Sequence, residues 1–181
     1  DNRVAQRLLG ANLRCMPRYE YVSNLSTFVF TAHGDAELER AMESDWPALS
    51  SLLLDAGERH QFTPAWTQAA LRATGLAARD FFVLRRGGLI VACAALWDVS
   101  SQRQLVVSGY SPWLGRGRPL VNLVGRLLDL PKLPPPGERL RAAYLSHLAV
   151  DEGSVGDLSS LVAAVRGEAH RRGIGLVFMG H

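Results

Sequence analysis

Residues 2–12 form the first segment with a regular pattern of apolar and polar positions. Its apolar side chains recur every three or four residues behind the polar Asn2: Val4, Ala5, Leu8 and Leu9. This spacing predicts a short amphipathic helix with Asn2 as a competent N-cap. Aromatic and β-branched residues then fill 19–30 around the turn signal Ser23-Asn24, so we expect a hairpin after the helix.

A short strand over 37–42 and two helices are expected next. The first helix covers 44–57, with Asp45 as N-cap, a proline near the first turn and a glycine at the end. The second helix opens at Thr63-Pro64 and runs over 63–75.

The clearest hairpin joins strands over 81–84 and 89–97 through Arg85-Arg86-Gly87-Gly88. Its second strand is apolar almost throughout, which is typical of a central strand. Residues 102–128 mix polar and apolar positions, and we expect a helix, a break and a second helix that starts at Pro119.

The last forty residues read as strand, helix and strand, over 140–150, 158–171 and 174–179. The inward side of the helix is marked by apolar residues at helical spacing: Leu161, Val162, Val165 and Ala169. This order predicts a βαβ unit with two parallel strands.

Composition places the chain among soluble folded proteins. It has 181 residues, of which 48% are apolar and 20% charged, enough for one domain with a buried core. The 20 basic residues exceed the 17 acidic ones by only three, which is too little for a nucleic-acid-binding surface. Lys132 is the only lysine.

Cysteine usage and hydropathy indicate a cytoplasmic protein without a membrane partner. Cys15 and Cys93 lack a CxxC spacing, so neither a disulfide framework nor a metal site is expected. No apolar run approaches the ~18 residues of a membrane span. The chain begins at Asp1 without a methionine, and we interpret it as a piece of a longer protein.

Residues 144–179 resemble the central motif of the GNAT superfamily of acyl-CoA-dependent N-acetyltransferases. The resemblance lies in Tyr-Leu-Ser-His-Leu-Ala-Val-Asp at 144–151, a glycine-containing turn, a helix ending Ala-His-Arg-Arg-Gly at 169–173, and the strand 174–179. With the segments upstream it covers roughly 36–181. It implies an α/β fold with a mixed central β-sheet flanked by helices, to which an inserted helical segment near 100–130 is added.

The opening segment resembles a different part of the same superfamily. Residues 2–12 match the helix after the fifth strand, and the 19–30 hairpin matches the last two strands. We therefore divide the chain into 1–31, from a preceding GNAT-like repeat, and 32–181, a GNAT-like domain without its own last strands. A tandem protein is favoured over a circular permutant, and either predicts that the 19–30 hairpin packs near 174–179. The incomplete sheet edge favours a homodimer or a strand swap.

The resemblance implies acetyl-CoA as co-substrate, held by a loop whose family pattern is Arg or Gln, two residues, Gly, one residue, then Gly or Ala. At 153–158 this chain keeps Gly156 but has Gly153 for the cation, Leu158 for the last small residue and an added carboxylate, Asp157. The negative charge of Asp157 would repel a phosphate at this loop unless a neighbouring positive charge compensates it. The other implied CoA-binding residues are Leu148, Ala149, Val150, Ser154 and Asn2.

Three side chains are candidates for proton transfer: His147 and Glu152 as bases and Tyr144 as an acid, with Tyr110 a further candidate acid. Each has a structural alternative, since a strand histidine, a loop carboxylate and a packed tyrosine are common. The family's usual acid is a tyrosine whose matching position here is Leu9. Three tryptophans either line an acceptor pocket or belong to the core: Trp66, Trp97 and Trp113. The arginines between 116 and 126 either select an acidic acceptor or lie on a solvated face.

Two functions remain open at this point. The first is an N-acetyltransferase acting on the amine of a small molecule or peptide. The second is a catalytically inactive half-domain that supports an active repeat. The degenerate 153–158 loop favours the second, whereas the intact strand and helix around it favour the first.

Overall fold

The structure, a computed structural model, describes residues 3–11, 13–14, 17–19, 26–60, 63–100, 104–128 and 132–180. Its main sheet has six strands: β1 (Thr27–Thr31), β2 (Glu39–Arg40), β3 (Phe81–Arg86), β4 (Leu89–Trp97), β7 (Ala142–Val150) and β8 (Leu176–Gly180). They lie in the order β1-β8-β7-β4-β3-β2. The β7–β8 pair is parallel and the other pairs are antiparallel, so the sheet is mixed.

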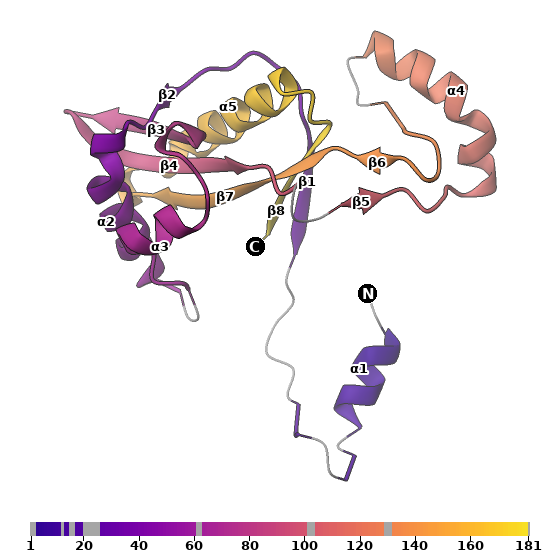
Figure 1. Cartoon of the computed structure of the whole chain (residues 1–181), viewed down its shortest axis with the longest axis horizontal. Helices are drawn as coiled ribbons and strands as arrows, with labels where there is room; N and C mark the ends of the chain where they lie inside the picture. The colour runs from indigo at the N-terminus through magenta and orange to yellow at the C-terminus, as the bar shows by residue number, and fades with distance from the viewer. Residues whose placement is uncertain are drawn as a thin grey trace.

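Helices cover both faces of this sheet (Figure 1). The α-helices are α1 (Arg3–Gly10), α2 (Trp46–Gly57), α3 (Gln68–Ala73), α4 (Pro112–Leu127) and α5 (Leu158–Arg171), and the 3-10 turns are η1 (Glu43–Asp45), η2 (Ala78–Asp80) and η3 (Glu152–Asp157). One core cluster joins α5 to the sheet through Leu161 and Val165, and a second joins α2 and α3 to the opposite face through Leu49 and Leu71. The predicted α/β class, with a mixed sheet flanked by helices, is confirmed.

The first described strand completes the sheet beside the last one. β1 is antiparallel to β8 with Phe28 opposite Met179, which confirms the predicted packing for residues 27–31. Residues 20–25 of the expected hairpin lie outside the described part of the chain. The division at residue 31 stays a prediction.

The chain passes from β1 over α5 to reach β2 at the far edge of the sheet. This crossing is close: a Cβ built on Gly167 of α5 would lie 3.0 Å from the Ala36 carbonyl oxygen and 3.2 Å from that of Gly34. Arg166 fixes the start of the crossing, since its Nε–H donates to the Thr31 carbonyl at 2.8 Å. Helix and connection therefore touch through backbone at Gly167.

The predicted insertion near 100–130 contains β5 (Leu105–Val106) and α4, and together with β6 (Arg139–Leu140) it forms an arm beyond the main sheet (Figure 1). The expected break at Pro119 is wrong, because α4 continues through it. A proline there removes one backbone hydrogen bond of the helix, and α4 continues beyond it despite that loss. One side of α4 is apolar and exposed: Trp113, Leu120, Val121, Leu123, Val124 and Leu127.

Two other boundaries also differ from expectation. The second helix begins at Gln68 rather than at Thr63-Pro64, because the Thr67 hydroxyl caps it by accepting from the Ala70 N–H at 3.2 Å. Asp45 precedes α2 but does not cap it. Its carboxylate accepts from the Met42 N–H and from Arg85, both at 2.7 Å.

No helix among the described residues has the length and apolar character needed to cross a bilayer.

The contact at Gly167 predicts that Gly167→Ala lowers the free energy of unfolding by about 1–3 kcal/mol, because the added methyl group forces the backbone of the crossing away from α5. Urea denaturation measures the change. The matched control is Gly117→Ala in α4, where a Cβ meets nothing within 4 Å, and this change should be neutral or stabilising. Equal effects of the two substitutions would contradict the packing described here.

Candidate functional site

The two parallel strands β7 and β8 separate along their length. They pair only at Ala142–Leu176, Ala143–Val177 and Tyr144–Phe178. On its other side β7 stays paired with β4 as far as Val150. Residues 145–150 therefore have one edge that no described strand pairs with.

A β-bulge at the centre of β7 accompanies this separation. Ser146 pairs with Ala95 and Ala149 with Cys93, so two residues of β7 lie opposite Ala94 alone. His147, in the bulge, has a φ of 49°, a conformation that is uncommon outside glycine. Leu145 faces the α5 core and Ala149 the α2 core, although a regular strand would place both on one face.

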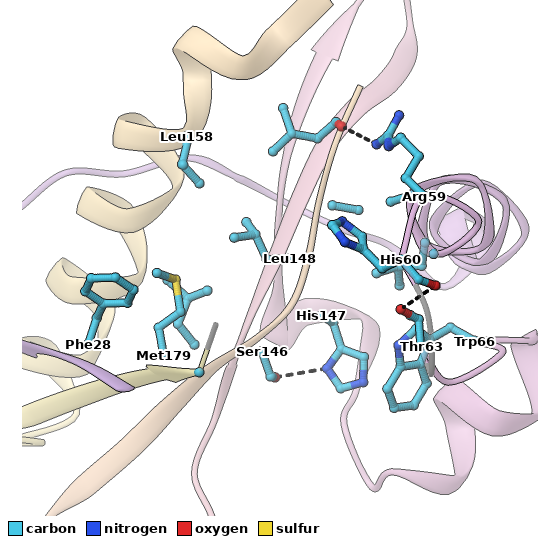
Figure 2. Close-up of a pocket in the computed structure, with 17 residues that line it drawn as sticks. Phe28, Arg59, His60, Thr63, Trp66, Ser146, His147, Leu148, Leu158 and Met179 are labelled. Carbon is cyan, nitrogen blue, oxygen red and sulfur yellow. Dashed lines mark hydrogen bonds between the residues drawn. The ribbon is translucent and has the colours of Figure 1, made fainter. Parts of the chain in front are cut away.

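A cleft of about 640 Å³ opens along the unpaired edge. Figure 2 shows its walls, which come from β7, from the α2–α3 region and from the β1–β8 pair. The lining includes Leu148, Val150, Leu158, Trp66, Phe28 and Met179. The cleft has the size and the mainly apolar wall of a small-molecule site.

His147 is the most unusual side chain in this wall. Its ring lies 4.3 Å from Trp66, 5.6 Å from Phe81 and 6.0 Å from Trp97, measured between centroids. Nδ1 is hydrogen-bonded to Ser146 Oγ at 2.9 Å, and the buried Nε2 has no hydrogen-bond partner among the described residues. Burial lowers the pKa of His147 to about 4. The imidazole is therefore neutral at pH 7, and its Nε2 is left without a partner in the described part of the chain.

The loop after β7 begins with a well-satisfied turn. The Asp151 N–H donates to the Val91 carbonyl at 2.9 Å, and the Ser154 N–H donates to the Asp151 carbonyl at 2.8 Å. Ser154 is 2% exposed, so it supports the loop from inside. Gly153 and Gly156 are exposed, and Leu158 lines the cleft.

Two arginines that the sequence did not single out reach this loop from opposite sides. Arg86, at the end of β3, donates through Nη1 to the Gly153 carbonyl at 3.3 Å and pairs through Nη2 with Asp157 Oδ2 at 2.8 Å. Arg59, just after α2, donates through Nη2 to the Val150 carbonyl at 3.1 Å and lines the cleft. The sequence offered only the hairpin turn as a signal for Arg86, and the pairing of β4 with β7 brings that turn to the end of β7.

The remaining predicted residues lie elsewhere or outside the described part. Tyr144 stands at the paired end of β7, where it lines a separate cavity of about 420 Å³. The Tyr110 hydroxyl donates to the Pro134 carbonyl at 2.7 Å. Trp113 is 75% exposed on α4. Asn2 and the side chain of Glu152 are not among the described parts of the structure.

Comparison with known proteins gives structural matches alone. No family model matches the chain, and no curated protein does. Rv2747 from Mycobacterium tuberculosis, solved with CoA, matches at 17% identity and a TM-score of 0.46 over 78% of this chain and 61% of its own. N-acetylglutamate synthase from Neisseria gonorrhoeae, complexed with coenzyme A and N-acetyl-glutamate, matches at 15% identity and a TM-score of 0.45. This match covers 88% of this chain and 26% of the synthase chain.

A GCN5-related N-acetyltransferase from Ralstonia eutropha matches at 16% identity and a TM-score of 0.40, over 86% of this chain and 82% of its own. The chain thus spans less than two thirds of the first two proteins.

The buried imidazole predicts a pH-dependent stability. Because the pKa of His147 is about 4 in the folded chain and about 6.5 when unfolded, the unfolded state binds more protons between these values. The free energy of unfolding should therefore fall as the pH falls from 7 to 5. It should fall less in His147→Asn, since asparagine tolerates the positive φ and does not titrate. Denaturant titrations of both proteins measure the difference.

Carboxyl groups do not obscure this comparison. Burial raises the pKa of Asp45, but the Met42 N–H and Arg85 lower it further, and Glu168 is held below its ordinary value in the same way by Arg172, Arg171 and Arg40. Both therefore stay ionised at pH 5. Identical pH slopes for the two proteins would show that His147 is not buried as described.

Proposed function

We propose that this chain is the acetyl-transfer unit of an acyl-CoA-dependent N-acetyltransferase that modifies the amine of a small molecule or peptide. The observation that carries the proposal is the cleft in which an unpaired strand edge meets the neutral, buried His147. The resemblance in the sequence names the same reaction for the same strand and helix.

The unpaired edge suits the donor substrate. An extended pantetheine arm can hydrogen-bond to a free strand edge as a further strand would, and Leu148 and Val150 both line the cleft there. Ala149 is 2% exposed and pairs with Cys93 of β4, so its neighbours Leu148 and Val150 present the free edge. Beyond Val150 the loop leads into the N-terminus of α5, where backbone N–H groups favour a phosphate. Acetyl-CoA supplies the acetyl group as an activated thioester.

His147 is assigned the role of base. As the amine nitrogen bonds to the acetyl carbon and the carbon–sulfur bond breaks, the amine loses a proton and the sulfur leaves as a thiolate. A neutral imidazole with an unpartnered Nε2 can accept that proton. The proton then passes from His147 to solvent, and the thiolate takes a proton from solvent. Trp66, against the His147 ring, forms a flat wall for the acceptor.

The second candidate, a supporting half-domain without activity, is favoured by Leu158. This large side chain lines the cleft at the position where the family pattern has a small residue, and Leu9, at the position of the usual acid, is 37% exposed on α1.

In either case we propose that 1–31 derives from a preceding repeat and that the parent protein is a homodimer or strand-swapped. β1 fills the edge beside β8 within one chain, so in such an exchange this strand would come from the second copy instead.

Acetyl-CoA should raise the thermal stability of the chain. A ligand that binds only the folded state at 100 times its dissociation constant adds about 2.7 kcal/mol. Differential scanning fluorimetry over a range up to millimolar acetyl-CoA measures this, with acetate as the control ligand. If the midpoint does not move at millimolar acetyl-CoA, the chain alone is not the acetyltransferase unit.

His147→Asn should lower kcat for acetyl transfer by about 10²–10⁴-fold and leave the dissociation constant of CoA unchanged, because it removes a base and no donor contact. Thiol release measured with dithiopyridine reports kcat on an amine library. Trp113→Ser on α4 is the control and should leave kcat unchanged. Full activity in His147→Asn would assign the base elsewhere.

A further inference from the structure

The 153–158 loop lacks the cation that its family pattern places at the first position and carries a carboxylate in addition. We propose that Arg86, from the β3–β4 hairpin, takes the place of that cation in the folded structure and binds the phosphates of CoA. The same guanidinium neutralises the charge of Asp157. The inference rests on the proposed function and assigns a donor-binding residue to it.

The register of the sheet brings Arg86 to this place. Ala92 pairs with Val150, and the Asp151 N–H donates to the Val91 carbonyl at 2.9 Å. The hairpin turn before β4 therefore lies beside the loop after β7, although Arg86 and Asp157 are 71 residues apart. Arg86 bonds the carbonyl of Gly153 itself, the residue that stands where the family has its cation.

The side chain of Asp157 does not cap α5, the helix that begins at the next residue. Asp157 occupies the N-cap position of α5, yet its side chain makes no capping hydrogen bond. The carboxylate turns instead to Arg86 at 2.8 Å. The first turn of α5 contains no acidic residue, so its N–H groups are not met by a carboxylate from Asp157 or from the turn itself. The charge that would repel a phosphate is thus paired with Arg86.

Stability does not explain the pair. The side chains of Arg86 and Asp157 are 58% and 31% exposed, and such surface pairs contribute little to folding. A guanidinium has five N–H donors in a planar fork that matches phosphate, and the two described bonds of Arg86 use two of them. Arg86 therefore has donors left for a ligand at the loop.

The cleft gives an independent indication that a ligand approaches from this side. It runs from His147, which is 8% exposed and has an unpartnered Nε2, to Val150 and Leu158 on either side of the loop. Arg59 bonds the Val150 carbonyl at the same end. A ligand with an apolar arm in the cleft thus brings its other end to the 153–158 loop, which Arg86 contacts at Gly153 and Asp157.

Isothermal titration with CoA and with pantetheine, which lacks the phosphates, separates the roles. Arg86→Gln should weaken CoA binding about tenfold or more, the value of a lost charge-assisted hydrogen bond, and should leave pantetheine binding unchanged. Asp157→Asn should tighten CoA binding several-fold, because Arg86 then meets the phosphates without a competing carboxylate. The control is Arg72→Gln, another exposed arginine, which pairs with Glu43 away from the cleft.

Each other outcome overturns a defined part. If Arg86→Gln binds CoA as the parent does, or loses CoA and pantetheine to the same extent, Arg86 is not a phosphate ligand, and the proposed function stands. If Asp157→Asn also binds CoA more weakly, then Asp157 does not compete with the phosphates for Arg86, and that part of the proposal is wrong. If the parent chain binds neither ligand, the proposed function itself fails. Thermal unfolding without ligand shows whether each variant folds.

Discussion

The bulge at the centre of β7 is the feature on which the site depends. By inserting one residue opposite Ala94 it turns Leu145 toward α5 and Ala149 toward α2, so both cores are filled from one strand. The same change of direction parts β7 from β8 beyond Tyr144 and places the His147 ring among aromatic side chains. Core packing, the cleft and the neutral histidine thus have a single geometric origin.

Arginine side chains hold together the parts of the fold that surround this strand. Glu168 of α5, 9% exposed, is paired with Arg40 of β2 at 2.7 Å and with Arg172 at 2.7 Å, and Arg172 also reaches Asp80 of η2. A planar guanidinium can bond two partners at once, which an ammonium does less well. The scarcity of lysine therefore matches a fold in which arginines join separate elements to each other.

Local signals in the sequence were sufficient for elements whose ends are set by their own residues. The helix 158–171, the end of α2 at Gly57 and the Gly87-Gly88 turn, with φ values of 57° and 84°, were all predictable in this way. The positive φ of His147 and the Arg86–Asp157 pair were not, because both depend on the register between β4 and β7. The start of α3 was missed because Thr67 rather than Thr63 caps it.

The cleft also depends on the pairing of β1, an early strand, with β8, the last strand. Phe28 and Met179 are partners in the β1–β8 register, and both line the cleft opposite β7. Contacts of such large sequence separation form late, since the entropy of closing a long loop must be offset first. Arg166 of α5 donates a hydrogen bond to the carbonyl of Thr31 at the end of β1, and this bond holds β1 against the βαβ unit. The wall of the cleft opposite β7 is therefore complete only when β1 is paired with β8.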